Sequence, residues 1–276
     1  MTSAPRTIFF LGATGGCALS TLRRALAAGH MCVCLCRTPA TLSSLLAGAV
    51  NKPCPTSTPY SPPANLEIIQ GSAHDPVAVS KCLVRDGRLV DFVVFSIGNR
   101  PTLSGMLNMD KTVCQRGMEV LLQCVTSAES STTARGKATR VIAVSSTGIS
   151  DYYRDVPLVL VPVYKITLAI PHRDKKAMED LLVANWEGEN GKGVPVVWTV
   201  VRPSLLTDGP EFGEGLEGIR VGVEVLGREG RVESKAVGYT ISREDVGRWI
   251  YEELVMEGDS GPGGSKWAGK AVTLTY

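Results

Sequence analysis

Short, almost uninterrupted apolar runs recur along the chain and give its strongest structural signal. Such a run is typical of a strand buried on both faces of a parallel sheet, because neither face can then carry many polar side chains. The pattern predicts strands at Thr7–Leu11, Met31–Leu35, Leu66–Gln70, Phe92–Ser96, Arg140–Ser145 and Val196–Val201, and a last strand at Lys270–Thr275.

Between these runs the apolar residues change to helical spacing. The sequence predicts helices at Ala18–Ala28, Thr38–Leu46, Pro76–Leu83, Lys111–Ala128 and Arg173–Asn185. Strands that alternate with helices imply βαβ crossovers, so we expect an α/β fold with a doubly wound parallel sheet. A further helix is expected at Glu244–Val255, where Ser242 and Asp245 have the spacing of a capping arrangement.

Three segments interrupt this alternation. Asn51–Ala64 is rich in Pro, Ser and Thr, Thr126–Thr139 is small and polar, and Gly258–Lys266 is rich in glycine. Such compositions favour extended or flexible surface segments. We therefore expect three insertions that carry no chemistry of their own.

The region Gly209–Tyr239 is also Gly-rich, but it is charged and contains alternating valines. It predicts a small irregular lobe over the carboxyl edge of the sheet. Residues 203–240 would then form a substrate-side lobe of a single domain that spans residues 1–276, a length compatible with one large α/β domain.

Charge and hydropathy exclude several classes of partner. The formal net charge is +2 and the basic residues are scattered, so neither nucleic acid nor an anionic membrane is expected as a partner. No stretch approaches the ~20 apolar residues of a membrane span, and the N-terminal apolar run leads straight into a glycine turn rather than a cleavage site. We expect a cytoplasmic protein, either a monomer or a homodimer.

Cys32, Cys34 and Cys36 alternate along one predicted strand and would point to one face of the sheet. Three thiols could bind a metal, but no His or Cys stands at ligand spacing nearby. We expect small buried hydrophobes rather than a metal site.

The first predicted strand leads into Gly12-Ala13-Thr14-Gly15-Gly16-Cys17-Ala18 and then into a helix. Glycines allow a tight turn and a close approach of backbone N–H groups to a pyrophosphate, and a small residue at Ala18 lets the helix pack near the strand. The alternative is an ordinary Gly-rich turn. Its place at the first strand-to-helix junction favours a Rossmann-like dinucleotide site formed by Gly12, Thr14, Gly15, Gly16, Cys17 and Ala18.

Arg37 and Thr38 follow the second predicted strand, where proteins that bind NAD usually carry an acidic residue. A guanidinium matches a 2′-phosphate instead, and the Thr38 hydroxyl could add a donor. The alternative is a solvated arginine on a loop. The pattern favours NADP(H) as the cofactor.

Five further short stretches of the sequence, given at the end of this paragraph, occur in an order that is characteristic of a known family. On the glycine turn and these stretches, over nearly its whole length, the chain resembles the atypical short-chain dehydrogenases of the NAD(P)-binding, NmrA-like group. Ser96–Ser104 resembles a segment of the biliverdin reductase B type of flavin reductase, and the Pro/Ser-rich insertion resembles that of fungal polyketide-pathway reductases. The stretches are Arg37–Pro39, Val144–Thr147, Asp174–Glu179, Trp198–Pro203 and Thr240–Val246.

This resemblance implies further cofactor contacts. Asp75 matches the family aspartate near the adenine. Ser96, Ile97 and Gly98 would line the nicotinamide ribose. Lys175 matches the family lysine. The residues expected to border the nicotinamide and the substrate are Pro203, Ser204 and Leu206.

The family's catalytic pattern is incomplete here. Ser146 or Thr147 supplies the hydroxyl, but Pro171 stands four residues before Lys175, where standard members have a tyrosine. That tyrosine, its pKa lowered by the lysine, exchanges a proton with the substrate oxygen. Lys175 and Glu179 are also spaced as an ordinary helical ion pair, which competes with a cofactor role for the lysine.

Three explanations stay open for the missing tyrosine. Another group could donate the proton: His172, Tyr164, Tyr152 or Tyr153. The alternatives are a surface position for His172 and a core position for Tyr164. A quinone or flavin substrate would need no enzymic acid, and a regulatory protein of the NmrA type would bind NADP without chemistry.

The leading hypothesis is an NADPH-dependent reductase of an aromatic ketone, a quinone or a polyketide-type intermediate in secondary metabolism. Its cleft would be bordered by Ser96–Thr102, Ser146–Tyr153 and Leu205–Gly218. A non-catalytic redox sensor is the first alternative. An isomerase or dehydratase on the same fold is the second.

Overall fold

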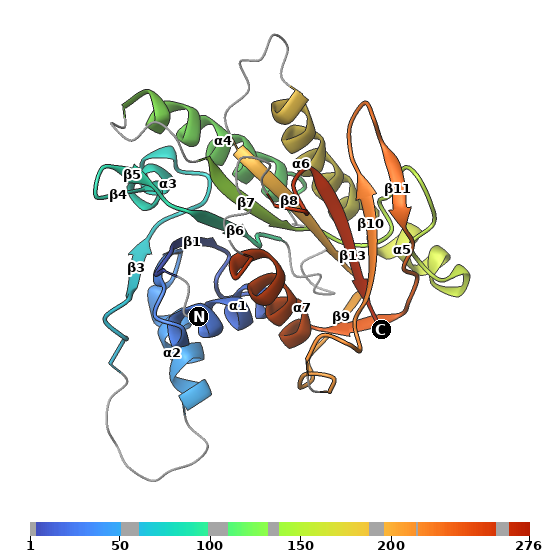
Figure 1. The fold of residues 1–276 in the computed structure, drawn as a ribbon, viewed down its shortest axis with the longest axis horizontal. Coiled ribbons are helices and arrows are strands. Elements are labelled where there is room, and N and C mark those ends of the chain that lie inside the picture. The colour runs from blue at the N-terminus through green and yellow to red at the C-terminus, as the bar shows by residue number, and fades with distance from the viewer. Residues whose placement is uncertain are drawn as a thin grey trace.

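The computed structural model describes residues 4–50, 61–98, 110–131, 138–187, 196–213, 215–257 and 265–276. Within these ranges a 9-stranded sheet has the order β11-β10-β13-β8-β7-β6-β1-β2-β3 (Figure 1). Its parallel strands are β1 (Thr7–Leu11), β2 (Met31–Cys36), β3 (Leu66–Gln70), β6 (Phe92–Phe95), β7 (Thr139–Val144), β8 (Val196–Pro203) and β13 (Lys270–Thr275).

Helices cover both faces of the sheet. Successive residues of each strand point to opposite faces and pack in one of two cores. Ile8 and Phe10 of β1 pack with α1 (Gly16–Ala27), α2 (Pro39–Val50) and α7 (Arg243–Trp249). Phe9 and Leu11 pack on the other side, with α3 (Pro76–Leu83), α4 (Val113–Ser131) and α6 (Ala169–Glu187). The doubly wound α/β fold expected from the apolar runs is confirmed.

Two segments differ from their expected structure. Residues 126–131 belong to α4 rather than to an insertion, because its apolar face continues through Val125 to the buried Ala128. Residues 220–234 are not an irregular lobe: β10 (Arg220–Val225) pairs with β13 in antiparallel orientation, and β11 (Arg231–Ser234) pairs with β10 in antiparallel orientation at the edge of the main sheet. The alternating valines there mark a strand whose partner lies far along the chain, so local composition alone did not reveal it.

Smaller elements were not expected at all. β9 (Leu205–Thr207) and β12 (Thr240–Ser242) form a separate parallel pair, and β4 (Val84–Arg85) and β5 (Arg88–Leu89) form a hairpin. A 3-10 turn at Leu158–Leu160 precedes α5 (Val161–Thr167). The other expected insertions lie largely outside the described residues. None of the described helices is both long and apolar enough to span a bilayer.

The capping arrangement and the cysteine row follow the sequence predictions. Ser242 Oγ accepts a hydrogen bond from Asp245 N at 3.0 Å and starts α7, which continues as a π-helical segment, Ile250–Val255. Cys32, Cys34 and Cys36 are buried in the core on the α1 side. Burial raises the pKa of Cys32 to about 12 and that of Cys36 to about 11, so these thiols stay protonated and act as hydrophobes.

Arg202 of β8 links α6 to β10 through buried charges. Its guanidinium donates to both carboxylate oxygens of Glu179, at 3.1 and 2.6 Å, and to Glu224 at 2.7 Å. All three side chains are at most 2% exposed. The two carboxylates raise the pKa of Arg202 further above its usual range, so it stays charged although burial opposes this. The arrangement fixes the register between helix and sheet.

We expect Arg202→Met to lower the free energy of unfolding by about 3–5 kcal/mol, because it leaves two buried carboxylates without a counter-charge. Denaturant unfolding at pH 7.5 measures the change. The matched control is Arg231→Met, since Arg231 is 58% exposed and pairs with Glu233, and it should cost below about 1 kcal/mol. Equal losses for the two variants would contradict this assignment.

Candidate functional site

The turn after β1 requires glycine at its first position. Gly12 has a φ of +85°, and a Cβ there would lie 2.4 Å from the Ser96 carbonyl oxygen. The Ser96 amide in turn donates to Leu11 O at 2.8 Å. The turn is therefore pressed against the residue that follows β6, and any side chain at Gly12 would separate them.

The first turn of α1 is open to an anion. Gly15 is its N-cap residue, no side chain among the described residues caps the helix, and no acidic residue lies in the first turn. Uncapped N–H groups at the positive end of a helix suit a pyrophosphate, so the residues present fit a dinucleotide. Cys17 and Ala18 are buried, and burial raises the pKa of Cys17 to about 12, so only their backbones could take part.

Arg37 stands at the predicted place, directly after β2, with an exposed side chain. Within the described residues its guanidinium makes no ion pair or hydrogen bond. Thr38 is also exposed, and its carbonyl accepts from Thr41 N at 3.1 Å at the start of α2. Both side chains are free to meet a ligand at the carboxyl edge of the sheet.

Asp75 has a structural function that the resemblance did not indicate. Its carboxylate caps α3 by accepting from Val77 N at 3.0 Å, and Pro76 occupies the first turn behind it. An N-cap residue of this type stabilises a helix by about 1 kcal/mol. A second contact of Asp75 with adenine stays a prediction.

Lys175 lies between the ends of β6 and β7. Its Nζ donates to Val144 O at 2.7 Å, and a Cβ on Gly98 would lie 3.8 Å from that nitrogen. The competing ion pair with Glu179 is wrong, because both oxygens of Glu179 are taken by Arg202. Lys175 therefore brings a positive charge to the carboxyl edge, beside the half-buried Ser96 and Ile97.

The predicted residues after β8 differ in exposure. Pro203 and Ser204 are buried; Ser204 N donates to Leu274 O at 3.0 Å, while its Oγ has no partner among the described residues. Leu206 is half-buried and packs on the α1-side core. These residues pack at the carboxyl edge of the sheet, and the Ser204 hydroxyl beneath that edge has no hydrogen-bond partner among the described residues.

A cavity of about 580 Å³ lies at this edge, beyond β7. Of the borders expected for the cleft, residues from the Ser146–Tyr153 segment line the cavity among the described residues, whereas residues 99–102 of the Ser96–Thr102 segment lie outside them. The segment Leu205–Gly218 does not line the cavity, because it is held elsewhere: Glu211 contacts α1 and α7, and Phe212 stacks near Tyr276. The lining residues are Gly148, Ser150, Asp151, Tyr152, Tyr153, Arg154, Asp155, Val156, Val161, Tyr164, Ala169 and His172.

Three of the predicted catalytic residues meet at the wall of this cavity. The Tyr164 and His172 rings are 5.5 Å apart, and the Thr147 hydroxyl acts on the pKa of Tyr164, although the Thr147 Oγ1 is buried without a hydrogen-bond partner among the described residues. Gly148 allows this contact, since a Cβ there would lie 2.8 Å from Tyr164 and 2.9 Å from His172. Ser146 is half-buried on the same segment.

The titration of this group is shifted towards neutral forms. Burial and the Lys175 charge lower the pKa of His172 to about 4, so its imidazole is neutral at pH 7. Its Nε2 is buried without a partner among the described residues. Burial also raises the pKa of Tyr164, although the Thr147 hydroxyl works against it. His172 is half-buried rather than at the surface, whereas Tyr164 is buried, as the alternative of a core position predicts, although its ring also lines the cavity.

The hydroxyls of the other two tyrosines are engaged away from this group. Tyr152 donates to Gly227 O at 3.3 Å, and Tyr153 donates to Thr273 Oγ1 at 3.4 Å. Their rings line the cavity, while their polar ends tie its loop to the turn after β10 and to β13. They contribute aromatic surface rather than a proton donor.

The cavity loop, residues 148–156, is held by two residues that sequence reasoning missed. Ser150 Oγ donates to Glu224 at 2.6 Å, which joins the loop to the Arg202 network. Asp155 Oδ1 accepts from Gly148 N at 2.9 Å, and its Oδ2 is buried with no partner in the part of the chain that the structure describes. Burial raises the pKa of Asp155 to about 6. No spacing or motif in the sequence marks either residue, because their partners lie on other elements.

Known proteins that are similar to this chain include members of a dinucleotide-binding family, which is consistent with the glycine turn and the open N-terminus of α1. A model of the NAD(P)H-binding family matches residues 12–257. Reductase pytE of Aspergillus terreus is 42% identical over 284 residues, covering 100% of both chains. Oxidase pynE of Aspergillus niger is 33% identical and covers 98% of each chain.

Solved structures share the fold at low identity. ChuY, an anaerobillin reductase from Escherichia coli O157:H7, has a TM-score of 0.59 at 16% identity, over 98% of this chain and 96% of that chain. The oxidoreductase ylbE from Lactococcus lactis has a TM-score of 0.60 at 15% identity, over 98% and 90%. At this identity the likeness concerns the fold alone.

Asp155 should make stability pH-dependent. The pKa of Asp155 is higher in the folded state than in the unfolded state. Its contribution to folding stability is therefore fully present below the unfolded pKa and is lost as pH rises through about 6. Asp155→Asn keeps the acceptor for Gly148 N and removes the charge. We expect it to be more stable than the wild type by about 1–3 kcal/mol at pH 8, with a smaller gain at pH 5.

Denaturant unfolding at the two pH values measures this gain. Asp151→Asn is the control, because Asp151 is exposed and pairs with Lys176 at the surface. It should show no stabilisation at pH 8. A loss of stability in Asp155→Asn at pH 8 would show that the buried carboxyl is needed in its charged form.

Proposed function

The chain belongs to the NAD(P)H-binding family, and we propose that it is an NADPH-dependent reductase of an aromatic ketone, a quinone or a polyketide-type intermediate. One observation carries the proposal. Lys175 stands at the strand ends, where its Nζ donates to Val144 O, and its charge acts both on Cys17 in the first turn of α1 and on His172 at the wall of the aromatic cavity. Cofactor site and cavity thus adjoin on one edge of the sheet.

The residues that would hold the cofactor come from neighbouring strand ends. The backbone of Gly12, Gly15 and Gly16 would take the pyrophosphate, and Arg37 with Thr38 the 2′-phosphate. Lys175 would bind the nicotinamide ribose beside Ser96, Ile97 and Gly98. When bound, NADPH supplies a hydride to the acceptor.

The cavity suits a flat aromatic acceptor. Three tyrosine rings and the His172 ring line it, and aliphatic side chains of Val156, Val161 and Ala169 complete the wall. Aromatic rings attract one another in offset or edge-to-face geometry, so a planar ring system gains more here than an aliphatic chain. The named relatives, a reductase and an oxidase from fungi, are compatible with such chemistry.

Proton supply is the step in which this chain departs from the standard pattern. Pro171 cannot donate, whereas Tyr164 stays protonated because burial raises its pKa. We assign the Tyr164 hydroxyl, beside Thr147, as the donor to a ketone oxygen after hydride addition, with neutral His172 placing its ring. A quinone accepts hydride without this donor, because its reduced form takes the proton from water.

Mixing the purified protein with NADPH and a panel of quinones and aromatic ketones tests the proposal. We expect loss of nicotinamide absorbance with at least one acceptor, and a reduced product in equal amount. Binding of NADPH without turnover would favour the non-catalytic sensor. Product formation without NADPH loss would favour the isomerase or dehydratase.

The proton donor has its own variant in the same assay. Tyr164→Phe should lower kcat for a ketone by roughly 100-fold, the usual contribution of a general acid, and change quinone reduction little. Tyr239→Phe is the control, because Tyr239 is 57% exposed and does not line the cavity. Equal losses for both acceptors in Tyr164→Phe would assign that residue to packing.

Arg37 should decide the choice of cofactor. We expect Arg37→Gln to weaken NADPH binding by about tenfold or more and to leave NADH binding nearly unchanged, because only the 2′-phosphate loses its partner. Fluorescence titration measures both affinities. Arg88→Gln, an exposed arginine on β5, is the control. An unchanged NADPH to NADH ratio in Arg37→Gln would place the 2′-phosphate elsewhere.

A further inference from the structure

Arg243, the first residue of α7, lies across the first residue of α1. A Cβ built on Gly16 would lie 2.4 Å from Arg243 Cδ and 3.0 Å from its Cβ. Besides its place in the glycine turn, position 16 therefore favours glycine because a side chain there would occupy the space of Arg243, which is distant in the sequence. The stem of Arg243 packs on the part of α1 that is open to an anion.

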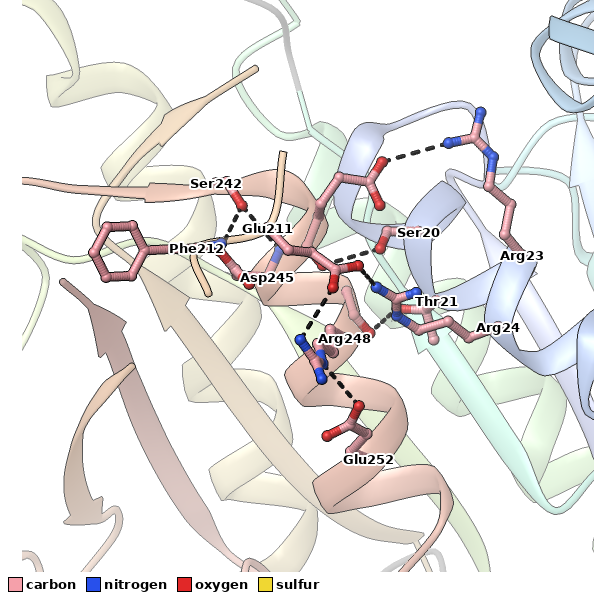
Figure 2. Close-up of polar contacts among 12 residues, drawn as sticks. Ser20, Thr21, Arg23, Arg24, Glu211, Phe212, Ser242, Asp245, Arg248 and Glu252 are labelled. Carbon is pink, nitrogen blue, oxygen red and sulfur yellow. Dashed lines mark hydrogen bonds and ion pairs between the residues drawn. The ribbon is translucent and has the colours of Figure 1, made fainter. Parts of the chain in front are cut away.

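Several polar contacts fix α7 on α1, as Figure 2 shows. Ser20 Oγ donates to Glu244 O at 3.0 Å, and Thr21 Oγ1 donates to Gly247 O at 3.1 Å. Glu211 bridges the helices by pairing with Arg24 on α1 and with Arg248 on α7. The position of Arg243 at the start of α1 thus follows from rigid helix packing.

The counter-charge of Arg243 is weakly held. Its guanidinium donates to Asp208 Oδ1 at 2.6 Å, but the Asp208 side chain is 89% exposed and that of Arg243 is 32% exposed. Asp208 follows β9 and makes no other polar contact among the described residues. An exposed pair of this kind contributes little stability, so an incoming anion can displace the carboxylate.

Positive charge predominates around this helix end. Burial raises the pKa of Cys17, but the charges of Arg243 and, next, Lys175 act to lower it, and both effects exceed the opposing effect of the Glu244 carboxylate. The first turn of α1 carries no acidic side chain. Two cations from separate elements therefore act on the first turn of α1, and the stem of one of them, Arg243, lies against it.

We propose that Arg243 binds the pyrophosphate of the dinucleotide from the α7 side and that Asp208 occupies its guanidinium only until the cofactor arrives. The inference rests on the dinucleotide binding of the proposed function and not on its chemistry. It gives the C-terminal helix a direct role in holding the cofactor, which closes the pyrophosphate site opposite the glycine turn.

The sheet order favours the pyrophosphate over the 2′-phosphate. Arg37 follows β2, on one side of β1, whereas Asp208 belongs to the segment after β8, on the other side of β1 beyond β6 and β7. In a fold of this type the adenosine lies towards β2 and the nicotinamide towards the opposite strands. Arg243 is therefore on the side of the central phosphates.

Titration of NADPH and NADH into the purified full-length chain, at low and at physiological salt, tests this role. We expect Arg243→Gln to weaken both nucleotides by about tenfold and to leave their ratio unchanged, because both carry the pyrophosphate. Asp208→Asn should tighten both about twofold at low salt, and this gain should vanish in the Arg243→Gln background. Arg248→Gln controls for a general disturbance of α7 and should stay within about twofold of the wild type.

Three results would overturn the proposal. Wild-type affinity in Arg243→Gln would show that Arg243 does not contact the dinucleotide. An altered ratio of NADPH to NADH affinity would show that it contacts the 2′-phosphate instead. An equal loss of affinity in Arg248→Gln would show that the effect comes from helix packing. Thermal unfolding of each variant confirms that it is folded. If the wild type turns over NADPH and Arg243→Gln binds NADPH as tightly as the wild type does, this inference alone fails. If the wild type binds no dinucleotide, the proposed function fails with it.

Discussion

The approach of the Gly12 backbone to the Ser96 carbonyl is the constraint on which the site depends. It is possible only without a side chain and with a positive φ, and it holds the end of β1 against the end of β6. The direction of α1 follows from this turn, and so does the place of its uncapped N-terminus. Lys175 and Arg243 then approach a helix end whose position is already fixed, so the positive charge of the edge is organised before any ligand binds.

A buried ionic network extends this order to the cavity. Glu179 lies one turn beyond Lys175 on α6, and Arg202 connects it through Glu224 to Ser150 on the cavity loop. Lys175 at the strand ends and the cavity loop are thereby fixed to one sheet. Buried pairs of this kind need not add net stability, but they exclude alternative registers because any slip would leave a charge unpaired. Burial raises the pKa of Asp155 to about 6, so this loop residue adds no further negative charge only below that pH.

The parallel strands were predictable because burial on both faces leaves a purely local signature. β1, β3 and β13 have the expected bounds, and the other predicted strands differ only at their ends. β10 and β11 were not identified as sheet strands, because β10 joins the sheet by pairing with β13, which lies far along the chain, and β11 joins it only through β10. The same limit applies to the site: the glycine turn and Lys175 could be found from motif and order, whereas Asp155, Arg202 and Arg243 gain their roles from partners on other elements.

By itself, the sequence determined the layered fold, the glycine turn and the family, since each is written in residue type and spacing along one segment. The family resemblance is confirmed by the match over residues 12–257. Only the tertiary structure decided that Lys175 faces the strand ends rather than Glu179, and that Tyr164 and His172 meet over Gly148. It also brought Arg243 to Gly16. The physical reason is that charge pairing and burial depend on distance in space, and a single chain records only distance along itself.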